Sequence, residues 1–154
     1  MTESQRIADQ LKRAFDGEAW HGPALREALD GVTAAMAVAH PIAGAHSIWE
    51  ITAHLAGWED VVSRRLTGEV LTEPPEGDFP AAPADAGEDA WAALQAKAHA
   101  GHARLVQQIG ELTEAGLKAR LDEKPYPVWF MAHGAVSHAL YHVGQIVLLK
   151  KSLS

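Results

Sequence analysis

The sequence contains no cysteine. This absence excludes disulfide bonds, a thiolate nucleophile supplied by the chain and metal ligation through sulfur. It fits a reducing compartment, and the polar residues 1–6 contain no apolar signal-peptide core. No apolar run approaches the roughly 20 residues that a membrane-spanning helix needs. We therefore expect a cytoplasmic protein with no membrane partner.

Basic side chains are also scarce. The chain has 13 Lys and Arg residues against 20 Asp and Glu residues, a net charge of -7, whereas binding to phosphate groups needs a basic face. Nucleic acid is therefore not an expected partner. The acidic excess lies in one segment, because seven acidic residues and no basic ones lie between Leu66 and Ala96. We expect this segment to be a solvated loop.

A clear alternation of apolar and polar residues, typical of half-buried strands, is missing. Alanine is abundant and 47% of the residues are hydrophobic, so we expect an all-α protein. With 154 residues, the chain has the length of a single domain, 1–154. Apolar spacing and capping residues predict four long helices, over about 2–17, 47–66, 88–112 and 127–151.

The longest expected connection is the acidic segment 69–87, which contains four prolines and two glycines. A connection of this length is unusual between adjacent antiparallel helices. It suits a crossover that makes two successive helices parallel. A short helix is expected within 113–120 and a loop over 122–127. The predicted fold is a four-helix bundle with one long crossover connection.

Two histidines lie four residues apart in the last predicted helix. At about 100° per residue, His138 and His142 are about 40° apart, on the same stripe as Met131 and Ile146. Because this stripe should face the core, both imidazoles should point inward. Imidazoles in an apolar interior need a partner, and one divalent cation can serve both. The pair is not a zincin protease motif, because Ala139 stands where the general-base Glu would be.

His54 is the strongest candidate for a third ligand. It lies on the inward face of the second long helix, and Trp58, one turn further on, can line a pocket and keep water out. The spacing leaves two interpretations open: a metal site formed by His54, His138 and His142, or three buried histidines bonded to carbonyl or hydroxyl groups. All-nitrogen ligation would suit zinc or nickel.

Two further polar residues are near these histidines in the expected helices. Glu50, one turn before His54, is a weak candidate for a catalytic base, but a capping box with Ser47 is the favoured interpretation. Gln145, about 60° from His142, can line the pocket and bond to a ligand or to the backbone.

The other histidines have simpler explanations. His133 is about 180° from His142 and should be on the surface. His102 falls on an inward stripe, where a core histidine with a hydrogen-bond partner is favoured over a fourth metal ligand. The remaining four, which suit turns, caps or mixed faces, are His21, His40, His46 and His99.

Four short motifs occur in a definite order along nearly the whole chain. They are Trp20-His21-Gly22-Pro23, Ser47-Ile48-Trp49-Glu50, His54-Leu-Ala-Gly-Trp58 and His138-x-x-x-His142-x-Gly144-Gln145-Ile146. Together they resemble the DinB-like (DinB/YfiT) superfamily of metal-dependent proteins. The resemblance implies an up-down-down-up bundle whose metal ligands are His54, His138 and His142. It also implies a homodimer and, in some relatives, use of a low-molecular-weight thiol such as bacillithiol or mycothiol.

Three imidazoles around one cation leave an open coordination position, as in catalytic zinc sites. The first function hypothesis is thus a metal-dependent enzyme that activates a thiol or water for an unidentified small-molecule substrate, a thiol S-transferase or a hydrolase. A thiol would have to arrive with a substrate or cofactor, because the chain has no cysteine. The alternatives are a non-catalytic, stress-related metal-binding scaffold, and a dimeric bundle whose histidine site is empty.

Overall fold

The computed structural model describes residues 1–121 and 124–154, and α-helices are the only extended regular elements within these ranges. The all-α prediction is therefore confirmed. Asp122 and Glu123, which begin the predicted loop 122–127, lie outside the described residues. The helices are α1 (Glu3–Asp16), α2 (Leu25–Leu29), α3 (Ala34–Val38), α4 (Ile48–Leu66), α5 (Glu88–Gly110), α6 (Glu114–Lys118) and α7 (Val128–Ser152).

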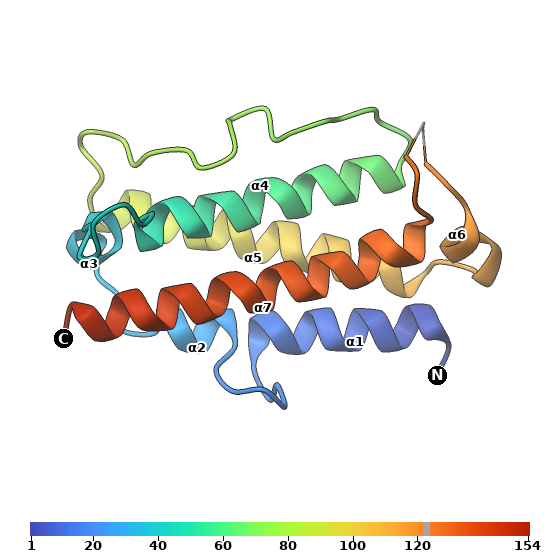
Figure 1. The fold of residues 1–154 in the computed structure, drawn as a ribbon, viewed down its shortest axis with the longest axis horizontal. Coiled ribbons are helices and arrows are strands. Elements are labelled where there is room, and N and C mark those ends of the chain that lie inside the picture. Colours follow the sequence, from blue (N-terminus) through green and yellow to red (C-terminus); the bar gives the residue numbers. More distant parts are fainter. Residues whose placement is uncertain (122–123) are drawn as a thin grey trace.

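Four of these helices are long and lie side by side (Figure 1). Helices α1 and α4 each pack against both α5 and α7. Along the view of Figure 1, α4 and α5 run in one direction, whereas α1 and α7 run in the other. The segment between α4 and α5 returns along the length of α4, which is what makes the two helices parallel.

Two of the long helices, α1 and α4, begin at residues whose side chains cap them. The hydroxyl of Thr2 accepts a hydrogen bond from the Gln5 amide, and the hydroxyl of Ser47 accepts one from the Glu50 amide. The Glu50 carboxylate in turn accepts from the Ser47 amide at 2.7 Å, completing the predicted capping box. Helix α3, in contrast, was not expected from the sequence; it is only five residues long, and so short a segment gives no periodic pattern.

The hydrophobic core consists of two clusters, one toward each end of the bundle. On α5 and α7 the buried or partly buried histidines fall between residues of the two clusters. On α4 the buried Glu59 does so, between Ala56 and Val62, whereas His54 lies among residues of the first cluster. His102 on α5, for example, lies between Ala98 of one cluster and Leu105 of the other. On α7, His138 lies between Ala135 and Val143 in the same way. A polar layer thus crosses the middle of the bundle.

The segment between α4 and α5 is only partly the solvated loop that its charge predicts. All seven acidic side chains between Leu66 and Ala96 are exposed. Pro74, however, is buried against α4, where a Cβ on Gly57 would approach the Pro74 Cβ to 3.1 Å. The glycine of the His54-Leu-Ala-Gly-Trp58 motif therefore lets this segment pack closely on the helix. Within the described ranges, no helix is long and apolar enough to cross a membrane.

Candidate metal centre

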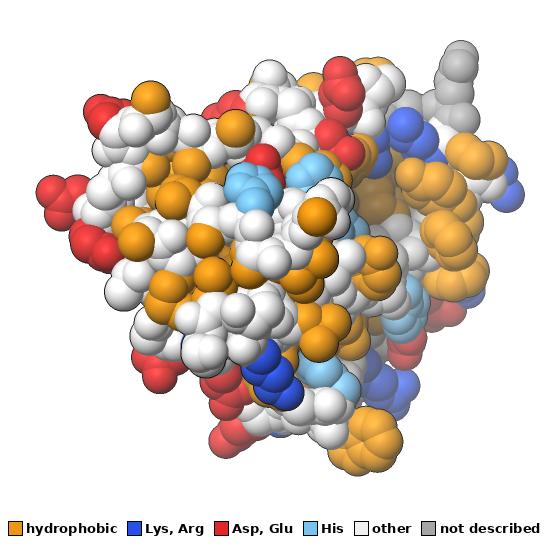
Figure 2. Space-filling model, turned by 60° about the vertical axis from the view of Figure 1, so that its left-hand side comes forward, with side chains coloured by type: hydrophobic (Ala, Val, Ile, Leu, Met, Phe, Trp, Pro, Cys, Tyr) orange, Lys and Arg blue, Asp and Glu red, His pale blue; other side chains and the backbone are white. Residues whose placement is uncertain are grey.

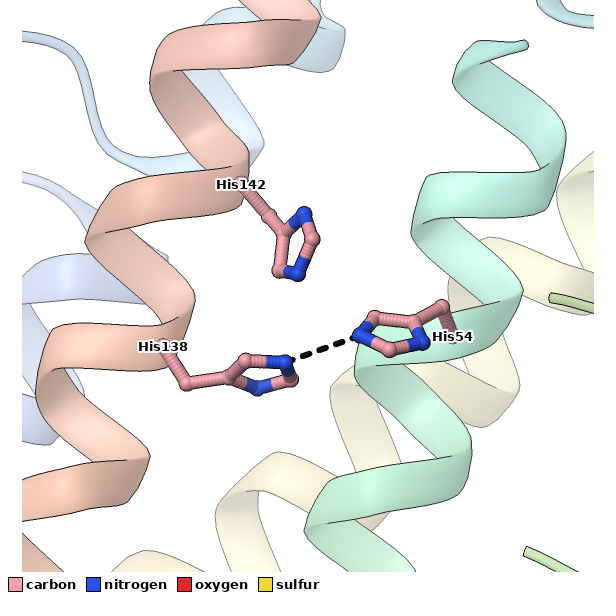
Figure 3. Close-up of side chains that lie close together, drawn as sticks. All are labelled: His54, His138 and His142. Atoms are coloured by element: carbon pink, nitrogen blue, oxygen red, sulfur yellow. Dashed lines mark hydrogen bonds between the residues drawn. The ribbon is translucent and has the colours of Figure 1, made fainter. Parts of the chain in front are cut away.

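Three histidine rings from two helices converge at the polar layer (Figure 3). Helix α4 supplies His54, and α7 supplies His138 and His142, one turn apart. One nitrogen from each ring can be chosen so that all three lie within 4.8 Å of one another. His54 and His142 are buried and His138 is partly buried. The sequence-predicted trio is therefore brought together in space.

Neighbouring groups fix the orientation of two rings. The Nδ1–H of His54 donates to the backbone oxygen of Asp78 at 2.7 Å, and the Nδ1–H of His142 donates to Oε1 of Gln145 at 2.7 Å. Each bond leaves the Nε2 lone pair of its ring available. Outer hydrogen bonds of this kind hold metal-binding histidines in the required tautomer.

The nitrogens are spaced as a cation would require after a small adjustment. Nε2 of His54 and Nε2 of His138 are 2.8 Å apart and share a hydrogen bond. A tetrahedral centre with bonds of 2.0–2.1 Å separates its nitrogens by about 3.3 Å. With a shift of about 0.5 Å, and with the His138 proton on Nδ1 in place of Nε2, the two Nε2 lone pairs could both face one cation. The donor set therefore fits a divalent cation.

The surroundings of His138 and His142 favour the neutral form of these two rings. Burial, together with the neighbouring His142 and His54 rings, lowers the pKa of His138 to about 4, although the Asp78 carboxylate acts in the opposite direction. Burial also lowers the pKa of His142, against the hydrogen bond to Gln145. Neutral imidazole is the form that binds metal ions, so protons compete less with a cation here than at an exposed histidine.

These shifts predict how the stability of the metal-free protein depends on pH. In the unfolded chain His138 titrates near 6.5, so below this pH the unfolded state takes up a proton that the folded state refuses until about pH 4. The free energy of unfolding should therefore fall as the pH is lowered from 6.5 to 4 and lose no more from this residue below that. Urea titrations of chelator-treated protein should show this slope, weakened in His138→Gln. The exposed His133→Gln variant should keep the full slope; equal slopes in all three proteins would contradict the prediction.

A cavity of about 440 Å³ opens beside the trio, between α4 and α7. Its wall is mostly apolar, and no Lys or Arg is among the described residues that line it. Trp58 lines it, with its indole N–H donating to the Asp78 carboxylate at 2.7 Å. The residues around the cavity are His54, Trp58, Glu59, Val62, Asp78, Tyr126, Phe130, Met131, Gly134, Ala135 and His138.

Two residues of the segment between α4 and α5 contact the trio, and neither contact was expected from the sequence. Asp78 binds His54 as described above, and the Phe79 ring stacks on the His54 ring with centroids 3.9 Å apart. The other face of Phe79 stacks on His46 at 3.7 Å. One signal was present in the sequence, because Phe79 is the only aromatic residue between Trp58 and Trp91.

The two remaining candidates lie near the trio but not in the cavity wall. Gln145, expected to line the pocket, is not among the lining residues; one turn along α7, it holds His142 instead. The Glu50 carboxylate is used by the cap and lies 3.1 Å from Nε2 of His40. Burial would raise the Glu50 pKa, but the bonds to Ser47 and His40 outweigh it and lower the pKa. Glu50 thus has the capping role.

Most of the other histidines are exposed, and histidine side chains reach the surface at separate places in Figure 2. The exposed ones are His21, His40, His46, His99 and His133. His102 is buried but is not part of the trio. Its Nδ1 lies 3.0 and 3.1 Å from the two carboxylate oxygens of Glu59. The favoured expectation for His102, a core histidine with a partner, agrees with this geometry.

The fold and the trio define a class of protein: an all-helical chain in which two of the long helices bring three histidines to a potential metal site. Residues 19–146 match the family model of the DinB superfamily. Because the match covers most of the chain, this protein belongs to the DinB superfamily. No curated protein and no solved structure matched the chain.

Proposed function

We propose that this protein is a metal-dependent enzyme that binds a divalent cation, zinc or nickel, through His54, His138 and His142. The reaction is the activation of a thiol or of water against a small-molecule substrate, as in a thiol S-transferase or a hydrolase. The observation that carries the proposal is that two rings of the trio, those of His54 and His138, line a cavity of about 440 Å³. On this proposal, the four long helices form the up-down-down-up bundle of the DinB-like fold.

A cation held by three imidazoles would supply an open coordination position and would acidify a thiol or water bound there. The side chains around the trio would orient the rings, exclude water and bind the ligand. Asp78 and Gln145 orient two of the rings, and Phe79 covers the face of His54. Trp58 and the apolar wall formed with Met131 and Phe130 exclude bulk water and bind the apolar part of a ligand.

Loading with metal tests the proposal directly. Saturating zinc or nickel at about 100 times Kd should stabilise the chelator-treated protein by about 2.7 kcal/mol. For a chain of this size that is a rise in melting temperature of roughly 5–11 °C. The matched comparison is His142→Ala, which should show no such rise, with His133→Ala as the control that keeps it. A wild-type protein without stoichiometric metal binding would contradict the proposal.

A second function is supported by one observation: the trio joins α4 to α7, so a cation could serve as a structural tie without turnover. Turnover separates the two functions. Loaded protein should transform thiol conjugates or electrophiles, and His142→Ala should lose this activity while keeping its helical circular dichroism. Strong binding with no turnover on either class of substrate would favour the scaffold. The homodimer, the thiol cofactor and the cytoplasmic location stay predictions.

A further inference from the structure

A second polar group, independent of the trio, is buried beside the same cavity. The carboxylate of Glu59 on α4 and Nδ1 of His102 on α5 are 3.0 Å apart. Only 5% of Glu59 and 2% of His102 is exposed. The ring of Phe15 stacks on His102 at 4.2 Å and restricts its rotation. Side chains from α1, α4 and α5 therefore hold one carboxyl–imidazole pair in a fixed geometry.

The Glu59 side of the pair faces the cavity, and the His102 side is closed off in the interior. Glu59 is among the residues that line the cavity, together with His54 and His138. Nε2 of His102, on the far side of the pair, is buried and has no hydrogen-bond partner among the described residues. A hydrogen bond whose only role is to join α4 to α5 would need neither a carboxylate at the cavity wall nor an imidazole with an unbonded, buried Nε2. Serine and glutamine already make such a bond one turn further on, between Ser63 and Gln108.

Such a pair can store a proton. Each oxygen of a carboxylate keeps a lone pair after it accepts the Nδ1–H bond of an imidazole. A proton arriving from the cavity would neutralise the Glu59 carboxylate on its free lone pair, while the Nδ1–H bond from His102 stays in place and holds the carboxyl group. No Lys or Arg is among the described residues that line the cavity, so no basic side chain there competes with His102 for the carboxylate oxygens.

We infer that Glu59, positioned by His102, is the proton acceptor for a protic ligand bound at the trio. The S–H bond of a thiol, or an O–H bond of water, breaks and an O–H bond forms on a carboxylate oxygen of Glu59. The electron pair of the broken bond stays on the ligand sulfur or oxygen, and nothing is oxidised or reduced. This inference rests on the proposed function, because the ligand is the one that the trio would activate.

The test counts protons as a thiol binds. Cobalt-loaded protein is titrated with benzyl mercaptan near neutral pH, in calorimetry buffers that differ in protonation enthalpy, and binding is followed by the sulfur-to-cobalt absorption. In the wild-type protein Glu59 should keep the proton, so that almost none reaches the buffer. In Glu59→Gln about one proton per bound thiol should be released, as expected when a thiol must bind as thiolate.

Two comparisons separate this role from a structural one. Ser63→Ala removes another, partly buried bond between α4 and α5, four residues along the same helix, and thiol binding to this variant should release no proton. The infrared difference spectrum of wild-type protein should show a carboxylic-acid C=O stretch when the thiol binds, and Glu59→Gln should lack it. The C=O stretch of the wild-type protein can be looked for even if the Glu59→Gln variant does not fold.

The outcomes distinguish this inference from the proposed function. If the wild-type protein releases one proton per thiol and shows no new C=O stretch, Glu59 is not the acceptor, although thiol activation stands. If benzyl mercaptan does not bind, the thiol form of the proposed function fails. The pH dependence of the cobalt absorption then tests water as the ligand, and an unchanged midpoint in Glu59→Gln overturns the inference. Failure to bind cobalt at all overturns both.

Discussion

Replacing His142 with alanine is expected to weaken zinc or nickel binding by more than about 100-fold. Loss of a partner that only orients a ligand typically costs 10–100-fold in metal affinity, and loss of a ligand itself should cost more. The ring is also held in place before any cation arrives, because Nδ1 is bonded to Gln145 at 2.7 Å. Competition against a chelator of known affinity measures the change.

A graded series makes this prediction specific to the geometry of the trio. Gln145→Leu should weaken binding by about 10–100-fold, since the His142 ring is kept and only its orienting bond is lost. His133→Ala, on the same helix but exposed, should bind as the wild-type protein does. An equal loss in His133→Ala, or full affinity in His142→Ala, would mean that the trio is not the binding site.

The parts of the fold that depend on local chemistry were predictable from the sequence. The two long helices predicted to begin near residues 2 and 47 do begin there, capped by Thr2 and Ser47, because a capping box involves only four consecutive residues. The short helix over 113–120 was also found, with Thr113 as its cap. Helix α3 has the same kind of cap, at Thr33, but it was not predicted, because five residues are too few to give a periodic apolar pattern.

The trio was predictable for the same reason, whereas the residues that reach it from the connecting segment were not. His138 and His142 share a helical face by spacing alone. Asp78 and Phe79, in contrast, reach the trio from a connection whose path depends on where Pro74 packs against Gly57. An acidic, proline-rich composition says only that such a segment is not helical.

Glu59 was missed because α4 is buried on two sides. At about 100° per residue, Glu59 is about 140° from His54, which suggests an outward side chain if the helix has one buried face. In the structure α4 packs against both α7 and α5, so His54 faces one neighbour and Glu59 bonds to His102 on the other. Helical periodicity identifies the buried residues of a helix that has one continuous buried face, and it misses residues on a second, separate buried face.

The stability of the metal-free protein should depend strongly on the Glu59–His102 pair. His102→Leu leaves a buried carboxyl group without its partner, which typically costs about 3–5 kcal/mol. The melting temperature should fall by roughly 6–20 °C. Glu59→Met leaves the Nδ1–H of His102 unpaired instead, at a cost of about 1–3 kcal/mol. Urea unfolding of chelator-treated protein measures both changes without a contribution from metal binding.

The double variant decides whether the two side chains act as a pair. Glu59→Met with His102→Leu removes both polar groups and leaves none unpaired, so it should be less destabilised than the sum of the single variants by about 0.5–3 kcal/mol. Combining His102→Leu with a change at an exposed residue far from it, such as Lys118→Ala, should give additive effects. Additive losses in the Glu59 and His102 cycle would show that each residue is stabilised separately. In that case the carboxylate would be solvated from the cavity and would not depend on the imidazole, and the positioning role of His102 would fail with it.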